Sequence, residues 1–89
     1  MNIDYTVHIW KEGDQFVAQA MPLDVISSGT TPNEARAALD EAVHLFLMTA
    51  AAEGTLKEIL QEAGYEQQSE GWISPPWVAT EKHSMAVSA

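Results

Sequence analysis

Three aspartates are the side chains in this sequence best suited to catalysis, because paired carboxylates can hold two magnesium ions for phosphodiester cleavage. Asp4, Asp14 and Asp24 each lie near the end of an expected strand. A metal-dependent nuclease would bring at least two of them within a few ångströms of each other. Nothing else in the sequence converges on them, so we interpret them as solvated strand ends and expect no catalytic residue and no enzyme activity.

The three histidines are the next candidates for chemistry, as metal ligands. His8, His44 and His83 lie far apart in the sequence and lack the short spacing of metal-binding motifs. A metal site would need strands that bring His8 and His83 together. The chain has no cysteine, which excludes thiolate metal sites and thiol catalysis. We therefore expect ordinary surface histidines, no metal and no cofactor.

The charge balance points to a protein partner. Thirteen acidic residues stand against four basic ones, for a formal net charge of −9. Such a surface repels phosphate backbones, so we expect no direct nucleic-acid binding. It suits a basic protein, because complementary charge speeds encounter. The partner-binding residues predicted from charge and residue type are acidic helix positions and two tryptophans: Trp10, Glu34, Asp40, Glu41 and Trp77.

Hydrophobic periodicity indicates the elements that position these side chains. Alternation with period two predicts strands over residues 4–11, 15–20, 25–28 and 82–88. Thr31, Pro32 and Glu34 form a capping box that opens a helix, which Gly54 ends. A second capping-box pattern at Thr55 predicts a short helix ended by Gly64. The order β-β-β-α-α-β predicts one α+β domain over residues 1–89, with helices on one face of a small antiparallel sheet.

The late segment has the most unusual composition. Residues 67–71 read as a polar turn, and the adjacent prolines that follow exclude a central strand. A small domain without disulfides favours association, so we expect copies of the chain to form a homo-oligomer. The predicted interface between copies lies in this segment: Trp72, Pro75, Pro76, Trp77 and Val78. We interpret Met21, Met48 and Met85 as packing residues.

The sequence gives no sign of a membrane protein. The N-terminus lacks a positively charged leader followed by an apolar run. The longest apolar-rich stretch, around residues 43–52, is too short to span a bilayer. We therefore expect a cytoplasmic protein.

The first half of the chain resembles the HicB antitoxin family. The resemblance rests on YTVHIWKEGDQFVA from Tyr5, GTTPNEAR from Gly29 and DEAV from Asp40, and it covers about residues 4–50. It implies a partial ribonuclease-H-like α+β fold that binds a small basic mRNA-cleaving toxin of the HicA type. It also implies a homodimer or a homotetramer. Two departures are visible. MPLDV from Met21 replaces a Leu-Pro-Gly-Cys-like stretch, and no helix-turn-helix or ribbon-helix-helix pattern follows the domain.

Two functions from different classes remain open on this basis. One is a non-enzymatic HicB-like antitoxin that binds and neutralises the toxin. The alternative is a solitary HicB-like oligomeric domain with a regulatory or scaffold role and an unrelated partner. A neighbouring gene for a short basic protein would favour the first.

Overall fold

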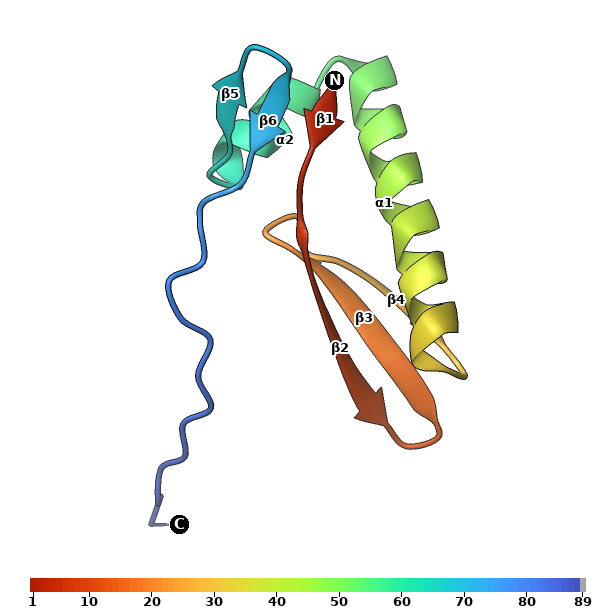
Figure 1. The fold of residues 1–89 in the computed structure, drawn as a ribbon, viewed down its shortest axis with the longest axis vertical. Coiled ribbons are helices and arrows are strands. Elements are labelled where there is room, and N and C mark those ends of the chain that lie inside the picture. The colour runs from red at the N-terminus through yellow and green to blue at the C-terminus, as the bar shows by residue number, and fades with distance from the viewer. Residues whose placement is uncertain (89) are drawn as a thin grey trace.

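A computed structural model describes residues 1–88 and shows an α+β fold (Figure 1). The predicted order of three consecutive strands followed by two helices is confirmed, and a further two-residue strand, which was not predicted, precedes them. The strands form two separate three-stranded sheets instead of one. In chain order the elements are β1 (Asn2–Ile3), β2 (Thr6–Glu12), β3 (Gln15–Met21), β4 (Val25–Gly29), α1 (Pro32–Glu53), α2 (Leu56–Glu62), β5 (Glu66–Gln68) and β6 (Gly71–Ile73).

The larger sheet is the antiparallel meander β2-β3-β4, and α1 covers one of its faces. The predicted hairpin joins β2 to β3 through Gly13, which adopts the left-handed region with φ 57°. The main core lies between the sheet and α1, and its fully buried members are Ala18, Ala20, Ala35, Leu39 and Val43. Three of these five are alanines, so the helix backbone can lie close to the sheet.

The predicted ends of α1 are confirmed. Thr31 is the N-cap, and its hydroxyl accepts a hydrogen bond from the Glu34 amide at 3.0 Å. Gly54 ends the helix in the left-handed region with φ 75°. Gly29 lets the preceding strand pass under the first turn, since a Cβ there would lie 2.6 Å from the Ala35 nitrogen. These local signals fix where α1 starts and therefore which of its residues face the sheet.

The smaller sheet has the order β1-β6-β5 and packs with α2 around a second core of Leu60, Tyr65 and Trp72. Asp4 joins this unit to the first residues of β2. Its carboxylate accepts hydrogen bonds from the Ser74 amide at 2.7 Å and the Ser74 hydroxyl at 2.5 Å. Its carbonyl accepts a third from the Tyr65 hydroxyl at 2.6 Å. The N-terminal segment therefore ties the two sheets together.

Several predictions for the second half of the chain are wrong. β6 is the central strand of its sheet, because Pro75 and Pro76 lie just beyond its end and remove no ladder hydrogen bond. Residues 82–88 are not a strand, since no described segment pairs with them. The second capping box does not form: the Thr55 hydroxyl donates to the Ala50 carbonyl at 3.4 Å.

Burial also corrects two predicted roles. Trp72 is only 5% exposed and packs inside the second core, so its side chain is not at the surface of a single chain to join the predicted interface. Pro75, Pro76, Trp77 and Val78, the other predicted interface residues, are exposed. Met48 and Met85 are exposed as well, so they are not packing residues in a single chain.

Beyond β6 the chain leaves the body in an extended conformation (Figure 1). Trp77 is its last contact with the larger sheet, where the indole Nε1 donates to the Thr6 hydroxyl at 2.8 Å. Among residues 1–88, no helix combines the length and the apolar character needed to cross a membrane.

Candidate functional site

The five predicted partner-binding residues lie on two different faces of the molecule. Val7 and Ile9 of β2 pack against the core under α1. Strand side chains alternate, so Trp10 points to the opposite, uncovered face of the sheet. Glu34, Asp40 and Glu41 belong to the helix that covers the other face. One flat interface therefore cannot contain the whole predicted set.

Trp77 joins Trp10 on the uncovered face of the sheet. Its indole stands edge-on to the imidazole of His8, with ring centroids 5.3 Å apart. Thr6, to which the indole donates, lies two positions before His8 on the same face of β2. The structure thus brings the two predicted tryptophans to one side of β2, separate from the acidic residues.

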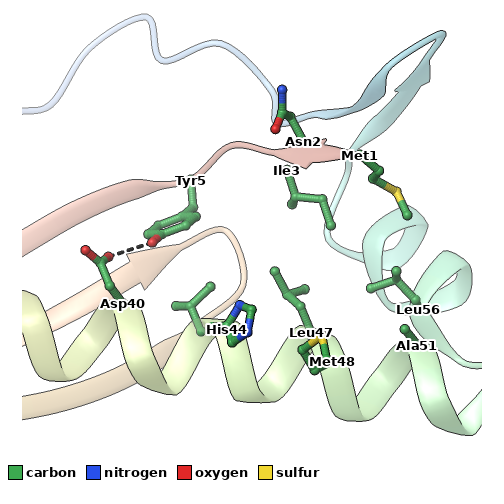
Figure 2. A pocket seen from close by; sticks show the side chains of 11 residues that line it. Met1, Asn2, Ile3, Tyr5, Asp40, His44, Leu47, Met48, Ala51 and Leu56 are labelled. Carbon is green, nitrogen blue, oxygen red and sulfur yellow. Dashed lines mark hydrogen bonds between the residues drawn. The ribbon is translucent and has the colours of Figure 1, made fainter.

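The acidic side of the molecule contains a groove of about 650 Å³ between β1, α1 and the start of α2 (Figure 2). Its floor is apolar, and its polar end is formed by one hydrogen bond. There the Tyr5 hydroxyl donates to Asp40 Oδ1 at 2.6 Å. The remaining side chains come mostly from α1 and from the N-terminal residues: Met1, Asn2, Ile3, Val43, His44, Leu47, Met48, Ala51 and Leu56.

The environment of Tyr5 favours its neutral form. Burial first, and then the hydrogen bond and negative charge of Asp40, raise the pKa of the Tyr5 hydroxyl to about 12. Burial and the charge of Asp4 raise the pKa of Tyr65 to about 12 as well. These are the two tyrosines of the chain. Both hydroxyls therefore remain hydrogen-bond donors well above neutral pH.

These shifts predict a titration that differs between the folded and unfolded chain. Between the ordinary tyrosine pKa of 10.0 and about 12, the unfolded chain should show tyrosinate absorbance that the folded chain lacks. The raised pKa values stabilise the fold below pH 10, and this contribution is lost as the pH rises through about 12. Ultraviolet titration of the native and urea-unfolded chain measures the difference. The Asp40→Asn variant should lower only the Tyr5 pKa; native tyrosines that both titrate near pH 10 would contradict the assignment.

The exposed side of α1 carries two large apolar residues that the sequence analysis did not select. Leu45 is 68% exposed and Met48 is 58% exposed. They follow Glu41 at positions i+4 and i+7, so the three side chains lie in one row along the helix. Shallow hollows flank this row, one beside Asp40 and Glu41 and one towards Ile59 of α2. We call Asp40, Glu41, Leu45 and Met48 the α1 surface.

Glu34 has a local structural role. Its carboxylate accepts hydrogen bonds from the hydroxyl of Thr30 and, at 2.9 Å, from the Thr30 amide. The hydrogen bond from the hydroxyl is the largest cause that lowers the pKa of this carboxyl, and the bond from the amide is the next. The carboxylate thus reaches Thr30, one residue before the Thr31 amide expected of the capping box. Glu34 closes the first turn of α1, which leaves Asp40 and Glu41 as the predicted acidic residues of the α1 surface.

The three candidate catalytic aspartates have separate surroundings. Asp14 lies in the β2–β3 turn, at the other end of β2 from Asp4. The Asp4 carboxylate is bonded to Ser74, and the Asp24 carboxylate accepts from Gln19 Nε2 at 2.6 Å. Within the described residues 1–88, no three histidine or carboxylate side chains are grouped so that they could hold a metal ion. The arrangement gives the two-metal nuclease no support.

His8 and His83, considered above as a pair of metal ligands, contact different residues. The His83 imidazole contacts Glu81 at 2.7 Å on the extended C-terminal segment. The His8 imidazole contacts Trp77 on the sheet. The two imidazoles therefore have different side-chain neighbours.

No family model, no curated protein and no solved structure matches this chain. The resemblance to HicB antitoxins consequently remains a prediction from the sequence. The function has to be inferred from the geometry and charge of the chain itself.

Proposed function

We propose that this chain is a HicB-like antitoxin that binds and neutralises a small basic ribonuclease toxin of the HicA type. The observation that carries the proposal is the α1 surface, where acidic residues stand beside exposed apolar ones. Leu45 and Met48 would supply the buried centre of the interface, and Asp40 and Glu41 its charged rim. A ribonuclease must attract RNA phosphates, so its active site is basic and complementary to this surface.

The charge distribution supports α1 as the binding element. α1 contains four acidic residues and one basic residue, whereas β3 and β4 carry no charged residue. A basic partner is therefore attracted more strongly to α1 than to β3 or β4. Trp10 and Trp77, predicted as anchors, lie on the sheet side, so the proposal replaces them as anchors by Leu45 and Met48.

The order of the elements supports the same proposal. The HicB-like motifs fall on β2, on the β2–β3 hairpin, on the start of α1 and on its third turn. Each motif thus has a structural place in a sheet covered by one long helix. Fold alone is weak support for an activity, so the proposal rests mainly on the α1 surface.

Reversal of one charge on this surface is expected to slow association with the partner. The Glu41→Lys variant should reduce the association rate by about three- to tenfold at low ionic strength, with convergence towards wild type at high salt. Glu41 is the suitable position because Glu34 holds the helix start and Asp40 holds Tyr5. Stopped-flow fluorescence measures the rate. The matched control is Glu66→Lys on β5; equal rates for Glu41→Lys and wild type at low salt would remove Glu41 from the interface.

Complex formation tests the function itself. A short basic protein encoded beside the gene for this chain is co-expressed with it, and the complex is analysed by gel filtration and light scattering. The proposal predicts a stoichiometric complex that forms with wild type and not with a Leu45→Glu, Met48→Glu variant. A neighbour of this kind that never associates with the chain would contradict the proposal. Self-association without any such neighbour would favour the alternative, a solitary HicB-like oligomeric domain with a regulatory or scaffold role.

A further inference from the structure

The last residues of the chain form an extended arm with exposed apolar side chains. We call residues 79–88 the C-terminal arm (Figure 1). Met85 is 87% exposed and Val87 is 78% exposed. Within residues 1–88, none of the hydrogen bonds joins the arm to the rest of the chain; its one side-chain contact is between His83 and Glu81. The arm therefore leaves both its apolar side chains and its backbone polar groups without partners in a single chain.

The sequence of the arm is that of a strand. His83, Met85 and Val87 alternate with three small residues, Ser84, Ala86 and Ser88. An extended segment with this pattern has one apolar side and one side of small residues, and its backbone N–H and C=O groups, which face water in a single chain, can pair with another strand. Residues 83–88 alternate as a strand does, but among the described residues no neighbouring strand pairs with them.

The larger sheet offers a free edge of the required kind. β2 pairs with β3 on one side and with no described strand on the other. The uncovered face next to this edge is apolar in part. Trp10 stands opposite Val17, and the exposed Ile26 of β4 stands opposite Gln19. A strand added at the edge of β2 would place alternate side chains beside Trp10 on this face.

The charge distribution identifies the occupant. The arm has one acidic and one basic residue, Glu81 and Lys82, so its net charge is zero. The net charge of β2 is also zero, because Lys11 balances Glu12. β3 and β4 carry no charged residue. The net charge of −9 therefore lies outside the arm and these three strands. Two copies of so acidic a chain repel each other least where the segments in contact have no net charge, and the arm and the three strands are such segments.

Within one chain, Trp77 lies on the face of the sheet, and among residues 1–88 the arm makes no hydrogen bond to the edge of its own β2. The indole lies on the uncovered face of the sheet, bonded to Thr6 and against His8. A strand paired with the edge must lie in the plane of the sheet, not above its face. The arm instead runs past the body (Figure 1).

We propose that two copies of this chain exchange their C-terminal arms, each arm adding a strand to the free edge of β2 in the other copy. Met85 and Val87 of one copy lie beside Trp10 of the second on the uncovered face. Exchange of an identical element is a direct route to a symmetric dimer, and it also covers an edge that would otherwise promote aggregation. The proposal is independent of the antitoxin function, because it uses the sheet and leaves the α1 surface free.

The test uses the full chain and two matched double variants, measured by light scattering over a range of concentrations. Wild type is expected to have the mass of two copies or more at micromolar concentration. The Met85→Glu, Val87→Glu variant should dimerise about 100-fold more weakly, since two apolar side chains lose their burial. The control Ser84→Glu, Ser88→Glu adds the same charge to the other side of the arm, so it measures the loss caused by charge repulsion alone, and it should dimerise at least about tenfold more tightly than the Met85→Glu, Val87→Glu variant. Equal loss in both variants, or no loss in either, would overturn the proposal.

Hydrogen exchange identifies where the arm lies. Alternate amides of residues 79–88, those that face β2 of the other copy, should be protected in the wild-type dimer. They should lose protection on dilution to monomer and in the Ala86→Pro variant, which disturbs the strand. Protection of the arm in a monomer would mean that it folds back on its own chain. Unprotected arm amides in a dimer would mean that the copies associate through another surface. Either result would overturn arm exchange.

Discussion

Substitution of Leu39 by alanine is expected to destabilise the fold by about 2–5 kcal/mol, the range for loss of a fully buried leucine side chain. Leu39 has 0% exposure and lies at the centre of the core between α1 and the sheet. Its neighbours in that core include Ala18, Ala20 and Ala35, whose short side chains cannot move to fill the cavity. Urea unfolding followed by far-ultraviolet circular dichroism measures the change.

The same helix provides a matched control. Leu45→Ala makes an identical chemical change at a position that is 68% exposed, so it should alter stability by no more than about 0.5 kcal/mol. A stability loss at Leu45 as large as the loss at Leu39 would mean that the exposed side of α1 is buried in solution. Such a result would require an assembly that covers this side of the helix.

The second large effect is expected on the α1 surface. The Leu45→Glu, Met48→Glu variant should weaken binding of the basic partner by about 100-fold, because both apolar anchors are replaced by charge. The stability of the chain should change little, since neither residue belongs to a core. Isothermal titration calorimetry measures the affinity.

A control for this variant is available on the other sheet. Ile73 of β6 is also an exposed apolar residue, and Ile73→Glu adds negative charge away from α1. It should leave the affinity for the basic partner within about threefold of wild type. If Ile73→Glu weakened binding as much as the α1 variant, added charge would be the cause, and the α1 surface would lose its assigned role.

The elements of the first half follow from signals that are local in sequence. Thr31 caps the start of α1 and Gly54 ends it, and the hydrogen bonds that form each cap join residues close together in the sequence. Alternation in β2 and β3 places Val7 and Ile9 under the helix and Trp10 outside it. Gly13, which adopts a positive φ, forms the turn that joins the two strands of the hairpin. These features need no knowledge of distant residues, which is why the α+β order could be predicted.

The second half depends on contacts between distant residues. Trp72 is buried because Leu60 and Tyr65 surround it, and no local pattern around Trp72 indicates this. The link from Asp4 to Ser74 spans almost the whole chain. Alternation over residues 82–88 predicts a capacity to pair but not the strand with which to pair, so the expected strand is absent from a single chain.

Only part of the candidate site could be predicted, because some of its contacts also join residues far apart in the sequence. Residue type selected Asp40 and Glu41, but the hydrogen bond from Tyr5 to Asp40 joins residues 35 positions apart. The sequence does contain a signal for Leu45 and Met48, which is the composition of the second half of α1. There, apolar residues lie on all sides of the helix. A helix of that kind is normally covered on all sides, so exposed positions within it indicate a partner.

The most direct measurement for the central claim is RNA cleavage by the small basic neighbour protein, titrated with this chain. The proposal predicts that cleavage falls to background when the two are equimolar. It further predicts that the Leu45→Glu, Met48→Glu variant needs about 100-fold more chain for the same effect. Cleavage that continues unchanged in the presence of excess folded wild-type chain would contradict the antitoxin function.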